Sequence, residues 1–132
     1  MGSHIALAVV AVALLGASRA QAAGGCVDQA RAAFDAKFPA LYGPDAAIEQ
    51  VKSLQVVEQE SLAWVANCVH CPQKPFGNAN GKWEAFKQLV RPADCVVRFS
   101  TNPRSWERQQ GQQGYALIRE GSLVKTFLIM RN

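Results

Sequence analysis

Histidine is scarce in this sequence, and that scarcity limits the catalytic mechanisms open to the chain. Only two histidines occur, His4 near the start and His70. A single histidine serves as a general base only beside a nucleophile or an acid, and no serine or aspartate pattern supplies one. The sequence also has no glycine-rich phosphate-binding loop. We therefore predict a protein that is not an enzyme and that holds no metal or cofactor.

The N-terminus lacks an apolar run long enough for a permanent membrane helix, which needs roughly 20 residues. The run covers residues 5–15, and Ala20-Gln21-Ala22 then has the small-x-small form that signal peptidase cleaves. We predict that residues 1–22 are a signal peptide, although the first four residues lack the usual lysine or arginine. Residues 23–132 then form one domain, which is periplasmic or secreted and has no stable membrane insertion after cleavage.

Charge is unevenly distributed along the predicted mature chain. Residues 23–73 have three basic and six acidic side chains, whereas residues 74–132 have ten basic and four acidic ones. A basic half on an exported protein points to an anionic partner, either an envelope polymer or an acidic protein, although an ordinary solvated face has the same composition. The basic residues are dispersed and the predicted compartment is wrong for nucleic acid, so we predict no nucleic-acid partner.

Hydrophobic periodicity divides the domain into helices and strands. Apolar residues three and four positions apart predict helices over residues 27–41 and 82–90, and residues 105–108 form a single helical turn. Alternating apolar residues predict five strands, over residues 51–58, 62–68, 95–100, 115–119 and 123–130. This order predicts an α+β fold, an antiparallel sheet of about five strands with an N-terminal helix and a second short helix on one face.

The first two predicted strands lead into the most conspicuous motif of the chain. A short polar turn would join them as an antiparallel pair, and Leu62 and Trp64 would then be buried against the first helix. The second strand ends in Cys68-Val69-His70-Cys71.

Four cysteines in a small exported domain are typical of two disulfide bonds. We predict that these bonds use all four cysteines, Cys26, Cys68, Cys71 and Cys95. Three pairings are possible, and the sequence does not select one. The interpretation that we favour pins the end of the second strand to the N-terminus and to the third strand. In an alternative, Cys26 is a lipidated N-terminus, which leaves an odd number of thiols.

The motif at Cys68–Cys71 allows other interpretations. It resembles the active site of periplasmic thiol–disulfide oxidoreductases, but the prolines and glycine that follow exclude the helix that such a site needs. A zinc site would take its ligands from Cys68, His70, Cys71 and Cys95, and would leave Cys26 unpaired. Covalent haem attachment requires a histidine directly after the second cysteine, where this chain has Pro72.

A candidate binding surface comes from tryptophans with basic neighbours. An aromatic side chain beside cations at a loop is a recurring composition of binding hot spots. The residues that we assign to this surface are Trp83, Arg104, Trp106 and Arg108. In the alternative interpretation both tryptophans complete the small core.

Two resemblances accompany these patterns. The first rests on Phe99-Ser100-Thr101 through Ser105-Trp106, residues 111–115, residues 117–119 and Met130-Arg131-Asn132. This tail resembles the C-terminal part of small exported bacterial proteins of unknown function. The second rests on a leading helix, Tyr42-Gly43 and then paired strands with a tryptophan, which is similar to cystatin-like and NTF2-like small domains, including immunity proteins. The first resemblance implies a shared fold and no particular chemistry.

These observations together predict an exported non-enzymatic binding protein of the inhibitor or immunity type, which recognises an envelope protein or an anionic polymer. Two other functions stay open. One is a thiol–disulfide redox or zinc protein built on Cys68–Cys71. The other is a small-ligand carrier with a pocket between a helix and the sheet.

Overall fold

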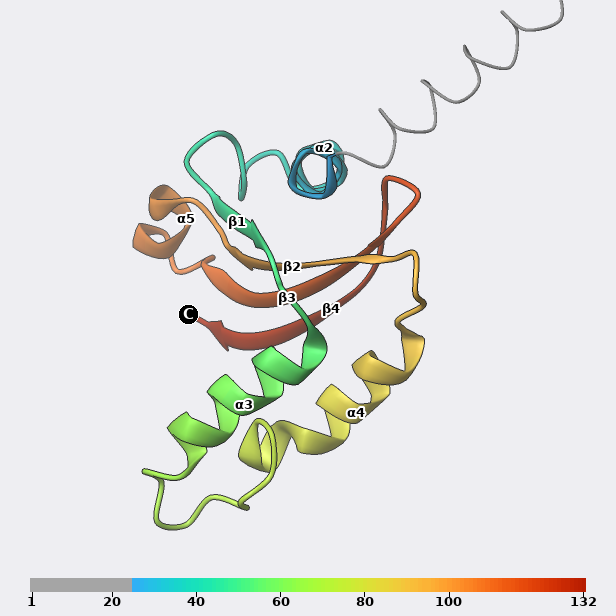
Figure 1. Ribbon diagram of the computed structural model, residues 1–132. Coiled ribbons are helices and arrows are strands. Elements are labelled where there is room, and N and C mark those ends of the chain that lie inside the picture. Colours follow the sequence, from blue (N-terminus) through green and yellow to red (C-terminus); the bar gives the residue numbers. More distant parts are fainter. Residues whose placement is uncertain (1–24) are drawn as a thin grey trace, which may run out of the picture.

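The computed structural model describes residues 25–132, so the predicted signal peptide lies outside the described residues. Within these residues the fold is α+β, with four helices and a four-stranded antiparallel sheet of order β1-β2-β3-β4, and Figure 1 shows how they are arranged. The α+β class is confirmed, with four strands rather than five.

None of the described helices combines the length and apolar character that a membrane-spanning helix requires. The elements are α2 (Cys26–Lys37), β1 (Ala47–Gln50), α3 (Leu54–Val65), the 3-10 turn η1 (Gly77–Ala79), α4 (Asn80–Leu89), β2 (Cys95–Ser100), α5 (Pro103–Glu107), β3 (Gln112–Arg119) and β4 (Ser122–Arg131).

Helices cover both faces of the sheet. Successive strand residues point to opposite faces, and in β2 both Val96 and Val97 are buried. Val97 belongs to a core with Phe34 of α2, whereas Val96 belongs to a core with Val57 of α3 and Trp83 of α4. The prediction that the N-terminal and second helices share one face is therefore wrong. The central strands carry apolar side chains on both faces of the sheet, so helices must cover each face to keep these side chains from water.

The N-terminal helix is confirmed, but α2 ends at Lys37 rather than at residue 41. Pro39 has no amide to donate, and it disfavours the helical conformation of the residue before it. Accordingly, Phe38 has left the helix, with φ −137° and ψ 61°. The chain turns back here, and Tyr42 stacks on Phe34 with 4.2 Å between the ring centroids.

The two strands predicted over residues 51–58 and 62–68 are wrong, because α3 occupies this part of the chain. Ser53 begins the helix: its hydroxyl oxygen accepts a hydrogen bond from the amide of Val56 at 3.1 Å. This N-cap geometry satisfies an amide that has no partner inside the helix. The Glu-Gln-Glu segment that we assigned to a turn consists of good helix formers.

The buried residues of α3 follow the helical period. Val57 and Val65, which lie about two turns apart, face the core. The prediction that Leu62 and Trp64 are buried is wrong, since these side chains are 38% and 72% exposed. The alternation that suggested a strand therefore does not reflect a buried face.

The remaining strands match their sequence signals closely. β2 has the predicted bounds, and β3 and β4 contain the predicted strands over residues 115–119 and 123–130. The four-residue strand β1 was not predicted. It pairs with β2, with Ile48 opposite Phe99, and it forms one edge of the sheet while β4 forms the other.

Candidate functional site

The four residues predicted to bind a partner do not form one surface. Trp83 is fully buried, and its ring packs against Phe86 and Phe127 with centroid distances of 5.6 and 5.4 Å. Trp83 thus belongs to the core, and its assignment to a binding surface is corrected. Arg104 and Arg108, by contrast, are exposed on α5 and directly after it. The predicted surface is therefore reduced to the corner around α5.

Trp106 is half-buried at that corner and has a structural role. A side chain at position 111 would collide with its indole, so Gly111 is the residue that lets the ring lie against the backbone. The carbonyl of Trp106 accepts a 2.8 Å hydrogen bond from Asn132, whose side-chain oxygen accepts one of 2.8 Å from the amide of Gly111. Figure 1 shows α5 and the C-terminus at the same end of the sheet. Through these contacts Trp106 links α5 to the end of β4.

The four cysteines form two pairs, Cys26–Cys95 and Cys68–Cys71, with Cα–Cα distances of 5.7 and 5.3 Å. The prediction that all four are disulfide-bonded is confirmed. The favoured pairing is wrong, because neither bond joins the motif at 68–71 to the N-terminus or to β2. Cys26 is bonded to Cys95, so its sulfur is not free for a lipid.

The proposed zinc ligands are not brought together. Cys95 is bonded to Cys26 at the start of α2, whereas Cys68, His70 and Cys71 lie in the turn after α3. Within residues 25–132, no three histidine, cysteine, aspartate or glutamate residues are arranged as a metal site.

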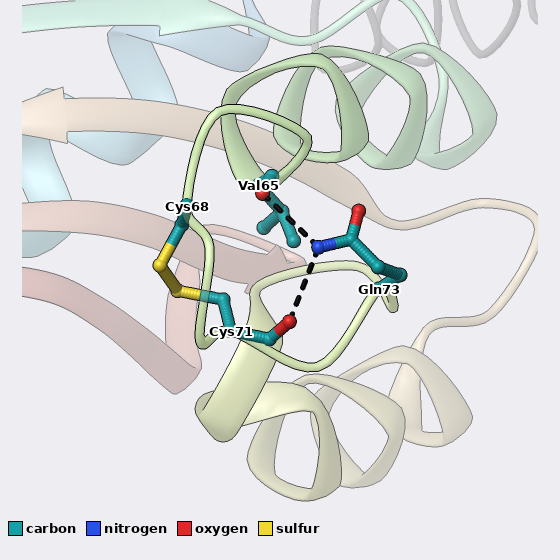
Figure 2. The surroundings of a disulfide bond; sticks show 4 residues. All are labelled: Val65, Cys68, Cys71 and Gln73. Carbon is teal, nitrogen blue, oxygen red and sulfur yellow. Dashed lines mark hydrogen bonds between the residues drawn. A yellow bond between two sulfur atoms is a disulfide. The ribbon is translucent and has the colours of Figure 1, made fainter.

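Figure 2 shows that the Cys68–Cys71 bond closes the turn directly after α3. The side-chain amide of Gln73 donates hydrogen bonds to the carbonyls of Val65 at 3.3 Å and of Cys71 at 3.1 Å. The amide of Cys68 also donates to the Val65 carbonyl, at 2.9 Å. Cys68 therefore follows the C-terminal end of a helix, whose partial negative charge disfavours the thiolate that exchange chemistry needs. The bond therefore closes a turn at the end of a helix, and not at a helix N-terminus of the kind that activates a thiol.

An apolar groove of about 560 Å³ lies between α3 and the sheet, and we call it the α3 groove. Its volume is within the range of about 300–1,000 Å³ that is usual for ligand sites. The apolar side chains that line it come from α3, the following loop, β3 and β4, and include Trp64, Phe76, Tyr115, Phe127 and Met130. The groove thus collects apolar groups from four separate parts of the chain.

The floor of the α3 groove is an aromatic cluster around Phe76. This ring lies 4.8 Å from both Trp83 and Phe127 and 5.9 Å from Tyr115, measured between centroids. Phe76 adopts a left-handed conformation with φ 63°, which is unfavourable for a bulky residue. Its neighbours hold it there, and Gly77 beside it packs close to Cys71. The floor is therefore held in place by contacts within the chain.

The rim of the α3 groove is exposed and apolar. Besides Trp64, it includes Ile129 and Met130 of β4, which are 39% and 57% exposed. Single exposed apolar residues are common, but a contiguous group of large ones marks an interaction site. The sequence pattern did not reveal this group, because it predicted Trp64 on a buried strand. The N-cap signal at Ser53 could have identified the helix and, with it, the exposed position.

A few polar groups also line the α3 groove. Arg98 of β2 and Glu60 of α3 contribute opposite charges. Burial raises the pKa of the Tyr115 hydroxyl, and Glu60 adds to this effect while Arg98 opposes it. The hydroxyl is therefore neutral at physiological pH and can donate a hydrogen bond. The groove combines an apolar body with a small number of polar partners.

A lysine connects the two helices on this face of the sheet. Lys87 of α4 lies 3.2 Å from Glu58 of α3 and 3.2 Å from Glu84 of its own helix. The hydrogen bonds to Glu84 and Glu58 raise the pKa of Lys87. These side chains are partly exposed, so we expect the pairs to align α3 with α4 and to add little stability.

A scan against models of protein families, a search of curated proteins and a search of solved structures each found no match to this chain.

Proposed function

We propose that this chain is an exported, non-enzymatic binding protein of the inhibitor or immunity type, and that the α3 groove receives an apolar part of a partner protein. The observation that carries the proposal is the position of Trp64. A large aromatic side chain stands exposed at the rim of a groove whose aromatic floor is already packed. Tryptophan is one of the three residue types enriched at binding hot spots, which lie in well-packed pockets.

The lining of the α3 groove favours a protein over an anionic polymer. A polymer would require several cations, whereas Arg98 is the one basic residue among the described residues that line the groove, and Glu60 offsets its charge. Apolar walls with a few polar groups suit a side chain or a short segment of a folded partner. The exposed Arg104 and Arg108 lie on a different corner and could add charge steering at most.

Export is part of the proposal, and two features support it. The paired cysteines fit an oxidising compartment, where disulfides persist. The N-terminal sequence has the form of a signal peptide. An inhibitor or immunity protein in such a compartment needs a rigid surface, which a small cross-linked domain provides.

Affinity capture tests the proposed function. The exported protein is immobilised and presented with the envelope and extracellular proteins of its own cell, and bound proteins are identified by mass spectrometry. We expect one specific partner, which the Trp64→Ala variant retains at least tenfold less well. Leu89→Ala is the matched control, because Leu89 is an exposed apolar residue of α4 outside the α3 groove. Equal retention by Trp64→Ala and Leu89→Ala would contradict the proposal.

A small amphipathic ligand is the second candidate for the same groove. The observation that favours it is the combination of about 560 Å³ of apolar space with Arg98 and the neutral Tyr115 hydroxyl. Saturable binding of the dye 1-anilinonaphthalene-8-sulfonate that is lost in Trp64→Ala and kept in Leu89→Ala would support this candidate. Absence of dye binding by the folded protein would exclude an open apolar pocket and leave the protein partner.

A further inference from the structure

β4 is an open edge of the sheet. It runs over Ser122–Arg131 and pairs with β3, and within residues 25–132 no other strand pairs with its outer side. An edge strand presents a row of backbone amides and carbonyls that an additional strand can use. The opposite edge, β1, is four residues long, whereas β4 has ten residues.

A second groove follows this edge. It lies between α4 and β4, measures about 580 Å³ and is lined by Lys82 and Phe86 of α4 and by residues 125–131 of β4. We call it the edge groove, and Figure 1 shows α4 next to β4. Residues 127–130 line both the edge groove and the α3 groove, so the two grooves adjoin. A segment that lies along β4 could therefore also reach the α3 groove.

The charged residues that line the edge groove are all basic. They are Lys82, Lys125 and Arg131, and the described lining contains no carboxylate. All three are exposed, and none forms a salt bridge within residues 25–132. Positive charge along an open strand edge is complementary to a segment that carries glutamate or aspartate.

The same charges argue against a second copy of this chain as the occupant. Pairing of β4 with the β4 of a second copy would bring two sets of these basic side chains to one seam, and the described lining of the edge groove supplies no carboxylate to offset them. Like charges directly opposite each other destabilise a strand pair. The register with β3 also shifts next to Val124 and Ile129, and such bulges twist an edge strand and interrupt long pairings. The β4 edge therefore has a regular pairing register only over residues 125–128.

We propose that a short, extended and acidic segment of the partner protein pairs with β4 between its two bulges, while a neighbouring apolar side chain enters the α3 groove. This inference rests on the proposed function, and it specifies the partner's chemistry. Backbone hydrogen bonds to β4 supply the register, and the acidic side chains contact the basic residues of the edge groove. The segment is short because the bulges limit the regular edge.

Synthetic peptides test the inference with defined chemistry. The probe is a blocked six-residue peptide that alternates glutamate and valine; one control replaces glutamate with lysine, and another carries N-methyl groups on alternate amides. We expect the acidic peptide to bind and to slow amide hydrogen exchange at residues 125–128 at least tenfold, and neither control peptide to bind. Absence of binding by the acidic peptide, or equal binding by its N-methylated form, would overturn strand addition.

Charge-reversal variants test the proposed contacts. The double variant Lys125→Glu and Arg131→Glu should bind the acidic peptide at least tenfold more weakly. Lys74→Glu is the matched control, since Lys74 is an exposed lysine outside both grooves. If Lys74→Glu weakens binding as much as the double variant does, the attraction is unspecific and the inference fails.

The outcomes separate this inference from the proposed function. Partner capture that depends on Trp64, together with no peptide binding at β4, overturns the strand-addition inference alone. Capture that does not depend on Trp64 overturns the proposed function, whatever the peptides do.

Discussion

Cys26, the first residue of α2, is disulfide-bonded to Cys95, the first residue of β2. These two residues are 69 positions apart in the sequence, whereas the bonded residues Cys68 and Cys71 are three apart. The long loop closed by the first bond contains both α3 and α4. The two bonds therefore restrict the unfolded chain to very different extents.

Removing the two disulfides should have unequal effects on stability. By the loop-closure argument, Cys26→Ser with Cys95→Ser lowers the free energy of unfolding by about 4 kcal/mol, and Cys68→Ser with Cys71→Ser lowers it by about 2 kcal/mol. Urea denaturation followed by circular dichroism measures both values. A larger loss from the second pair would show that the turn after α3 matters more to the fold than its loop length implies.

The contact between Gly111 and Trp106 leads to a second prediction. A methyl group at position 111 collides with the indole, so Gly111→Ala should destabilise the protein by about 1–3 kcal/mol. In the background of Trp106→Ala the same change should be nearly neutral, because the ring is gone. A double-mutant cycle by urea denaturation measures this coupling. Additive effects would mean that the two residues are not in contact.

The ion pair between Asp94 and Arg119 predicts a pH dependence. The carboxylate, which is 3% exposed, accepts hydrogen bonds of 2.8 Å from both Nε and Nη2 of Arg119. Chiefly through these bonds, the pKa of Asp94 lies below its ordinary value. A lowered pKa in the folded state stabilises the protein above the unfolded-state pKa of about 3.9, and this contribution disappears as the pH falls through the folded-state value.

Asp94→Asn should therefore remove this part of the acid sensitivity. We expect the variant to lose about 2 kcal/mol at neutral pH and to show a smaller decline in stability below roughly pH 4. Chemical denaturation at a series of pH values measures both effects. Exposed Asp45→Asn serves as the control and should follow the wild-type curve. A wild-type pH profile in Asp94→Asn would refute the assignment.

The sequence correctly predicted the elements in which the spacing of apolar residues matches the positions that are buried. β2 alternates around Val97 and Phe99, which are truly buried, and it was predicted with the observed bounds. The segment around Trp64 also alternates, but there the apolar residues are exposed, so the pattern predicted a strand where α3 lies. β1 is short and mostly exposed. It is a strand because it pairs with β2, and its own residues carry no alternating pattern that would predict a strand.

The candidate site could not be predicted from the sequence because it depends on tertiary placement. The α3 groove joins Trp64 to Phe76 and Met130, which come from three separate elements. The disulfide pairing depends on tertiary placement in the same way, since the packing of α2 against β2 is what brings Cys26 next to Cys95. Composition alone indicated Trp83 as a surface residue, whereas packing buries it.

The indole resonances of the three tryptophans report directly on whether the α3 groove is the binding surface. The captured partner is added to isotope-labelled protein, and the indole signals of Trp64, Trp83 and Trp106 are followed by nuclear magnetic resonance. If the α3 groove is the binding surface, the Trp64 signal shifts saturably while the signal of the buried Trp83 changes little. An unchanged Trp64 signal together with a shifted Trp106 signal would place the interface at the α5 corner and rule out the α3 groove as the binding surface.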